Sequence, residues 1–184
     1  MLVLASGRGE RFLASGGSTH KLRALLAGKP VLEHVLDAVR ASGLPWHLED
    51  AGHPGMGDSI AAAVRATQDA CGWLILPGDL PLIQGATLRL LAAKLAGARA
   101  CGLAGEAESC DVVVPVCNGQ RGHPVGFSAA CRDSLLNLEG NQGAALVISA
   151  YQAIKIVVND IGSVTDVDTV QDLQRAQALI DARP

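Results

Sequence analysis

Aromatic residues are scarce in this chain, which has two Trp, one Tyr and two Phe among 184 residues although 49% of the sequence is hydrophobic. A core of this composition must be built from Val, Leu, Ile and Ala, which is typical of layered α/β proteins. This apolar content excludes a disordered chain. The length suits one substantial core, so we expect a single domain over residues 1–184.

The sequence also lacks a run of basic residues, and its formal net charge is −3. A nucleic-acid partner is therefore not expected, because binding a phosphate backbone requires a basic surface. No stretch reaches the roughly 20 uninterrupted apolar residues of a membrane span, and no charged leader precedes an apolar stretch at the N-terminus. We expect a cytoplasmic protein without membrane association.

Paired cysteine and histidine motifs are missing as well. The cysteines are odd in number and contain no C-x-x-C pair, which argues against a disulfide framework and a zinc knuckle. We expect these residues to be reduced and mostly buried: Cys71, Cys101, Cys110, Cys117 and Cys131. Several histidines have no metal-ligand spacing and receive no role: His20, His34, His47 and His53.

What the chain does contain is an alternation of strand-like and helix-like segments. Strands are predicted at residues 1–5, 46–48, 72–81, 111–116 and 154–158, with a turn and return at 118–127. Helices are predicted from Pro30 to Gly43, from the turn at 51–59 to about residue 70, at 85–97, at 129–138, at 142–150 and from Thr169. This order predicts a three-layer α/β fold with a doubly wound, mostly parallel sheet.

A glycine-rich turn, "SGRGER" at residues 6–11, follows the first predicted strand. Glycines allow main-chain N–H groups to approach a phosphate closely. The dinucleotide fingerprint would need a glycine at Phe12, and a Walker A loop would need Gly-Lys-Ser/Thr at residues 12–14. Neither motif is present, so on its glycines alone the segment is equally consistent with a surface turn.

Carboxylates and cations follow several predicted strands, at the edge of the sheet where ligands bind. Asp79 ends an apolar strand, and "DIGSVTDVDTV" holds Asp160, Asp166 and Asp168. Such oxygens suit Mg²⁺ shared with phosphates and water, although a turn or N-cap aspartate is the alternative. Arg11 and Lys21 are placed to neutralise a polyphosphate, with plain surface charge as the alternative.

Six segments, in this order, resemble the MobA-like nucleotidyltransferases and, within them, the molybdenum-cofactor cytidylyltransferase branch. They are "LASGRGERF" at 4–12 with Lys21, "GKPVLEHVL" at 28–36, "GMGDSIAAAV" at 55–64, "WLILPGDLPLI" at 73–83, "GQRGHPVGFS" at 119–128 and "DVDT" at 166–169. The resemblance implies a Rossmann-like nucleotidyltransferase (GT-A-like) fold. It also implies an enzyme that joins an NTP to a phosphorylated acceptor and releases pyrophosphate.

The same resemblance implies roles for individual residues. Nucleotide contacts fall on Leu4, Ala5, Ser6, Gly7, Gly57, Asp58, Ser59, Pro77 and Gly78. Catalytic roles fall on Arg11, Lys21 and Asp79, and Mg²⁺ ligation on Asp79 with Asp168 or Asp166. The acceptor would face Gly122, His123 and Pro124, although a lone histidine before proline is more often structural. Displacement at the α-phosphorus needs alignment and charge neutralisation rather than a side-chain nucleophile.

The substrates remain open at this level. The complete "GHPVGF" block favours CTP and a molybdopterin acceptor, with GTP or another acceptor as the alternative within the family. A second hypothesis is a non-catalytic nucleotide-binding accessory protein for molybdoenzyme maturation, with a molybdoenzyme as its partner.

Overall fold

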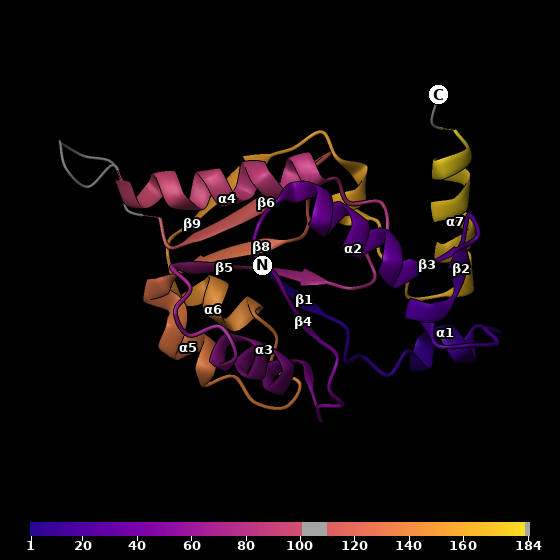
Figure 1. The fold of residues 1–184 in the computed structure, drawn as a ribbon, viewed down its shortest axis with the longest axis horizontal. Helices are drawn as coiled ribbons and strands as arrows, with labels where there is room; N and C mark the ends of the chain where they lie inside the picture. The colour runs from indigo at the N-terminus through magenta and orange to yellow at the C-terminus, as the bar shows by residue number, and fades with distance from the viewer. Residues whose placement is uncertain (101–109, 183–184) are drawn as a thin grey trace.

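The computed structural model describes residues 1–100 and 110–182, and over these residues its centre is a seven-stranded mixed sheet (Figure 1). The strands run in the order β4-β1-β5-β8-β6-β7, and β9 pairs with β6. Their bounds are β1 Leu2–Leu4, β4 His47–Glu49, β5 Gly72–Pro77, β6 Val112–Cys117, β7 Gln120–Arg121, β8 Val125–Ser128 and β9 Ala153–Val157. Only β7 and β8 run antiparallel to their neighbours among these strands, which confirms the predicted mostly parallel sheet.

Helices cover both faces of the sheet. In Figure 1, α2 (Val31–Ser42) and α4 (Gly85–Ala100) lie over one face, and α3 (Met56–Arg65), α5 (Arg132–Leu136) and α6 (Ala145–Ala150) lie over the other. Alternate residues of a strand point to opposite faces. Accordingly, Leu2 belongs to the apolar cluster with α3, whereas its neighbour Val3 belongs to the cluster with α2.

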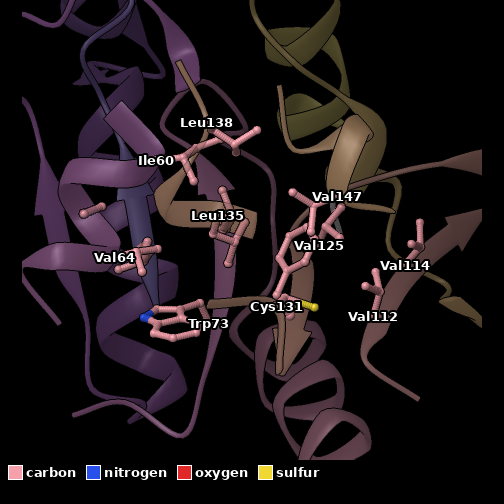
Figure 2. Close-up of a cluster of buried hydrophobic side chains, with 14 residues drawn as sticks. Ile60, Val64, Trp73, Val112, Val114, Val125, Cys131, Leu135, Leu138 and Val147 are labelled. Atoms are coloured by element: carbon pink, nitrogen blue, oxygen red, sulfur yellow. The ribbon is translucent and has the colours of Figure 1, made fainter. Parts of the chain in front are cut away.

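The cluster beneath α3 and α5 is shown in Figure 2. Trp73 of β5 is buried in the same cluster as Ile60 and Leu135, and burying side chains of this size contributes about 1.5–3 kcal/mol each. Its indole N–H donates to the Thr67 hydroxyl at 2.9 Å. This bond satisfies the polar atom of the largest side chain in the cluster.

A third cluster lies at one end of the sheet. There α1 (Glu10–Ala14), the 3₁₀ turn Lys21–Arg23, the hairpin β2 (Leu25–Leu26) and β3 (Lys29–Pro30), and α7 (Val170–Asp181) pack together. Phe12, Leu26 and Val167 are buried in it. A capping box between Thr169 and Asp172 starts α7. The cluster therefore brings the N-terminal loop and the last helix to the same place.

Several element boundaries follow the sequence patterns. Pro30 precedes α2, and Gly43 ends it with a φ of +69°, as predicted. The helix predicted to reach about residue 70 ends earlier, at Arg65, because residues 66–69 form turns. The Thr67 hydroxyl there donates back to the Ala63 carbonyl and accepts from the Trp73 indole.

The cysteines largely follow the prediction. Cys110, Cys117 and Cys131 are buried, whereas Cys71 is exposed and Cys101 lies outside the described residues. Across residues 1–100 and 110–182, no helix combines the length and apolarity needed to cross a membrane.

Asp160 is buried and has a structural role rather than facing a ligand. It is 2% exposed, and its carboxylate accepts hydrogen bonds from the Gln84 N–H, the Thr87 hydroxyl and the Gly162 N–H at 2.6–3.0 Å. These contacts join the start of α4 to the 3₁₀ turn Ile161–Val164. Asp160 therefore fixes the segment that leads to Asp166 and Asp168.

Replacing Asp160 with alanine is expected to lower the free energy of unfolding by about 2–4 kcal/mol, because three donors would lose their common acceptor. Urea unfolding followed by circular dichroism measures this change. Asp69→Ala is the control, since Asp69 is exposed and its loss should cost less than about 0.5 kcal/mol. Equal stability of the two variants would contradict the assigned role of Asp160.

Candidate functional site

The site lies where three parallel strands end together. In the strand register Leu4, the last residue of β1, is opposite both Glu49 of β4 and Pro77 of β5. The segments that follow these strands line a cleft of about 480 Å³, a volume within the usual range for small-molecule sites. Sequence-predicted residues on its walls are Leu4, Ser6, Gly7, Arg11, Lys21, Ser59, Pro77, Gly78, Asp79 and Asp168.

The first wall is the glycine-rich loop after β1. Within the described part of the chain, the main-chain N–H groups of residues 6–9 donate no hydrogen bond to another protein group. Gly9 has a φ of +66°, a conformation that favours glycine, and it precedes α1. Free N–H groups in a glycine turn suit an anion. The loop therefore has the chemistry of a phosphate-binding segment.

A serine pair connects this loop to α3. The Ser59 hydroxyl donates to the Gly55 carbonyl at 3.1 Å, so the Ser6 hydroxyl, 2.5 Å away, donates to Ser59. Ala5, also predicted to contact the nucleotide, donates its N–H to the Glu49 carbonyl at 2.8 Å. Both contacts hold the loop against neighbouring segments.

His20 determines where Lys21 lies, although no role was predicted for this histidine. Its Nε2 donates to the Gly7 carbonyl at 2.7 Å, and its Nδ1 accepts from the Leu22 N–H at 3.3 Å. The imidazole thus ties the turn at Lys21–Arg23 to the glycine-rich loop. Since neither contact follows from residue spacing, no sequence signal identified this histidine.

The Lys21 ammonium joins two carboxylates that are distant in sequence. Its Nζ lies 2.6 Å from Asp79 Oδ2 and 2.6 Å from Asp168 Oδ1, while Arg11 donates to Asp168 Oδ2 at 2.9 Å. The side chains of Lys21 and Asp79 are only 13% and 17% exposed, so solvent screens their pair weakly. The structure therefore brings together the predicted cations and two of the predicted carboxylates.

The ion pairs shift the pKa values of their members. Burial lowers the pKa of Lys21, but the Asp79 and Asp168 carboxylates outweigh this effect and leave the pKa above its usual value. Burial raises the pKa of Asp168, but Lys21 and then Arg11 outweigh it and leave the pKa below its usual value. Both groups are therefore charged at neutral pH.

Main-chain contacts hold the two carboxylates beside each other. The Val167 N–H donates to the Asp79 carbonyl at 2.9 Å, which places Asp168 next to the turn that follows β5. Asp166 is exposed, and desolvation together with the charges of Asp79 and Asp168 raises its pKa. No ion pair joins Asp166 to a cation within the described residues, so its metal role stays a prediction.

The donor set fits a hard divalent cation that retains open positions. Within residues 1–100 and 110–182, no three His, Cys, Asp or Glu side chains form a metal-binding group. Asp79 and Asp168 do converge on one cation, the Lys21 ammonium, which stands where a metal would share their oxygens. Mg²⁺ commonly takes one or two carboxylates and completes its shell with phosphates and water.

The cleft is also lined by residues to which the sequence analysis assigned no role, among them His53, Met56 and Asn141. His53 Nε2 lies 3.0 Å from Glu49 Oε1. Burial raises the pKa of Glu49, but the hydrogen bonds from His53 and the Ala51 N–H leave it below its usual value. The lining of the cleft therefore also includes an apolar methionine and a histidine held by a buried carboxylate.

Gly57 and Asp58 do not line the cleft, although both were predicted to contact the nucleotide. The Gly57 N–H donates to the Gly140 carbonyl at 2.8 Å, and a Cβ on Gly57 would meet the Glu139 backbone at 2.8 Å. Glycine is thus required for close packing. One carboxylate oxygen of Asp58 is buried without a hydrogen-bond partner in the described residues.

The predicted acceptor segment reaches the same edge of the sheet because β8 runs antiparallel. Val125, which begins β8, pairs with Ile75 of β5, so residues 122–124 come before it at the carboxyl edge. The main chain there is held by hydrogen bonds from the Gly122 N–H to the Pro115 carbonyl and from the His123 N–H to the Ser163 carbonyl. A Cβ on Gly122 would lie 2.5 Å from that Ser163 oxygen.

His123 is exposed, yet the surrounding protein desolvates its ring and lowers its pKa. The charges of Asp79 and Asp166 act on the ring in the opposite direction. The charge of Asp79 therefore acts on the imidazole, although His123, Gly122 and Pro124 do not line the cleft described above.

The sheet order, the helices on both faces and the cleft at the carboxyl edge define a Rossmann-like α/β protein. The family described as the MobA-like NTP transferase domain matches residues 37–154. The chain therefore belongs to the MobA-like NTP transferase family. This finding confirms the family and the fold that the sequence motifs indicated.

Individual relatives are more distant. The bifunctional protein GlmU of Desulfitobacterium hafniense (strain DSM 10664 / DCB-2) is 31% identical over 111 residues, which cover 49% of this chain and 24% of GlmU. GlmU of Stenotrophomonas maltophilia (strain K279a) is 31% identical over 118 residues, with 51% and 25% covered. The match thus spans about a quarter of the length of these relatives.

Solved structures share the fold over nearly the whole chain. Rv0371c of Mycobacterium tuberculosis H37Rv superposes with a TM-score of 0.75 at 21% identity, covering 96% of this chain and 95% of that one. A complex of Rv0371c with manganese has a TM-score of 0.70 at 21% identity and covers 96% of both chains. Molybdopterin-guanine dinucleotide biosynthesis protein A of Archaeoglobus fulgidus has a TM-score of 0.69 at 18% identity, covering 99% and 98%.

The lowered pKa of Asp168 predicts a contribution to stability that depends on pH. The contribution is present above the unfolded-state pKa, about 3.9 for an aspartate, and is lost as pH falls through the lower folded-state value. We therefore expect Asp168→Asn to flatten the loss of unfolding free energy between about pH 5 and pH 2.

Urea titrations at several pH values measure this slope. Asp69→Asn, which removes an exposed carboxylate, is the control and should retain the slope of the unmodified protein. A parallel pH dependence in Asp168→Asn and the unmodified protein would count against the ion-pair assignment.

Proposed function

We propose that the protein is a Mg²⁺-dependent nucleotidyltransferase that joins the nucleotidyl group of an NTP, with CTP favoured, to a phosphorylated acceptor of the molybdopterin type. The observation that carries this proposal is one cleft that combines free main-chain N–H groups, Arg11, Lys21 and two convergent carboxylates. This set matches the needs of a polyphosphate with a divalent cation.

Each part of the cleft has a role in this reaction. The N–H groups of residues 6–9 and the guanidinium of Arg11 bind the triphosphate, and Asp79 and Asp168 would hold the metal. When bound, the metal supplies charge neutralisation for the departing pyrophosphate. The acceptor phosphate oxygen displaces pyrophosphate at the α-phosphorus, so one P–O bond forms as another breaks. The protein contributes alignment and electrostatic stabilisation and needs no covalent intermediate.

The nucleoside and the acceptor would lie on opposite sides of Asp79. The nucleoside lies next to His53 and Met56, because His53 follows β4 whereas Asp79 follows β5, on the opposite side of β1. Residues 122–124 face the acceptor from the next strand of the sheet. The pterin-type acceptor is supported by the "GHPVGF" block and by the likeness to a molybdopterin-guanine dinucleotide biosynthesis protein.

The metal assignment rests on two points. The oxygens of Asp79 and Asp168 converge on one cation position, and a structural neighbour, Rv0371c, forms a complex with manganese. Because Mn²⁺ commonly replaces Mg²⁺ at oxygen-ligand sites, it is a suitable experimental probe for this position.

A pyrophosphate-release assay with each NTP in turn, molybdopterin and Mg²⁺ or Mn²⁺ tests the activity. We expect release with CTP to exceed release with the other nucleotides. Release with GTP instead would identify a guanylyltransferase. Binding of a nucleotide by calorimetry, without release for any NTP, would contradict transferase activity and support an accessory role in molybdoenzyme maturation.

Asp79→Asn is expected to lower the rate of transfer on the order of 100-fold, since one carboxylate charge at the metal position is lost. Asp69→Asn is the matched control on an exposed surface and should keep the original rate. Thermal unfolding verifies that both variants fold. An unchanged rate in folded Asp79→Asn at saturating Mg²⁺ would show that the metal assignment is wrong.

A further inference from the structure

We propose that Lys21 serves as an exchangeable counter-ion, occupying the cation position between Asp79 and Asp168 until a divalent metal and a polyphosphate bind together. The inference rests on the proposed function only in that the cleft binds these two ligands. It assigns Lys21 a second task besides contact with phosphate, and it makes metal binding and phosphate binding interdependent.

The distances make the metal and the ammonium mutually exclusive. Lys21 Nζ is 2.6 Å from one oxygen of each carboxylate. A magnesium ion bound by the same two oxygens would lie about 2.0–2.1 Å from them, in the volume that Nζ fills. The two cations would also repel each other strongly at such a separation. A metal that enters this position must therefore displace the ammonium.

The ion pair between Lys21 and Asp79 is too well buried for the ammonium to leave without a new anionic partner. The Lys21 and Asp79 side chains are 13% and 17% exposed, and Asp168 receives a second cation from Arg11. Breaking a buried ion pair leaves uncompensated charge, which is far costlier than breaking an exposed pair. Metal alone would have to meet this cost, so we expect it to bind weakly.

A polyphosphate supplies the replacement partner for Lys21. His20 fixes the backbone beside Lys21 to the Gly7 carbonyl, so the ammonium stays next to the glycine-rich loop when its side chain turns. Phosphate oxygens held by the free N–H groups of residues 6–9 would then lie within reach of the released ammonium. Each ligand thus lowers the cost of binding the other, and the coupling must be reciprocal.

Removal of the Lys21 charge should separate metal binding from phosphate binding. In Lys21→Met the carboxylates have lost the ammonium between them, so Mn²⁺ alone should bind about tenfold tighter than to the unmodified protein. Mn²⁺ should also raise the thermal midpoint more in this variant. Lys21→Gln, which retains a hydrogen-bond donor without the charge, provides the same test if the methionine variant does not fold.

Lys29→Met is the matched control. Lys29 forms an ion pair with Asp37 at 2.5 Å, but both side chains are about half exposed and lie outside the cleft. This variant should bind Mn²⁺ with the affinity of the unmodified protein. That result would show that the loss of a lysine charge elsewhere on the surface does not tighten Mn²⁺ binding.

Mn²⁺ binding is measured by electron paramagnetic resonance, with and without inorganic triphosphate and with correction for Mn²⁺ bound to free triphosphate. In the unmodified protein triphosphate should tighten Mn²⁺ binding by about tenfold or more, and in Lys21→Met this factor should be smaller, because only direct coordination of Mn²⁺ by the phosphate oxygens then remains. Equal Mn²⁺ affinity of Lys21→Met and the unmodified protein, without triphosphate, would overturn the proposal.

The outcomes distinguish this inference from the proposed function. If Lys21→Met binds Mn²⁺ more tightly while the unmodified protein releases no pyrophosphate from any NTP, the result would support the counter-ion role of Lys21 and contradict the proposed transferase activity. If the unmodified protein catalyses nucleotidyl transfer but Lys21→Met binds Mn²⁺ no more tightly than it does, the transferase activity is supported and the counter-ion role of Lys21 is contradicted. Absence of Mn²⁺ binding by every variant, with triphosphate present, would overturn both.

Discussion

The arrangement of the site depends on one balance of charge, in which the Lys21 ammonium offsets the carboxylates of Asp79 and Asp168. Two carboxylates at this distance from a common atom would repel each other without a cation between them. Two neighbouring contacts hold these side chains in place. His20 fixes the position of Lys21, and the Val167 N–H, bound to the Asp79 carbonyl, brings Asp168 to the strand end.

The parallel strands determine why this balance forms at the carboxyl edge of the sheet. The ends of β4, β1 and β5 are in register, so the segments that follow them must cross the edge side by side. Loops there can present main-chain N–H groups and side chains to one volume, while the apolar strand residues remain buried between the two helix layers. Stability and ligand chemistry are thereby assigned to different parts of each strand–loop–helix unit.

Sequence reasoning recovered the elements that carry a strong local signal. The β5 strand is a continuous apolar run, and α2 has a proline before it and a glycine after it. The hairpin of β2 and β3 was missed because two-residue strands have no periodicity, and one of its residues, Leu25, is exposed. The positions of the strand ends predicted which loops form the cleft. The ion pairs of Lys21 could not be predicted in this way, because they span 58 and 147 positions and depend on tertiary packing.

The segment "FLASGGSTH" between Arg11 and Lys21 shows why spacing alone does not locate a side chain. Its length costs little in loop-closure entropy, because that cost grows only with the logarithm of loop length. Phe12 is buried in the cluster with α7, and a Cβ on Gly17 would lie 2.3 Å from its ring, so the segment folds back on itself. With the excess length absorbed in this way, the bond from His20 to Gly7, rather than the number of residues, places Lys21 in the cleft.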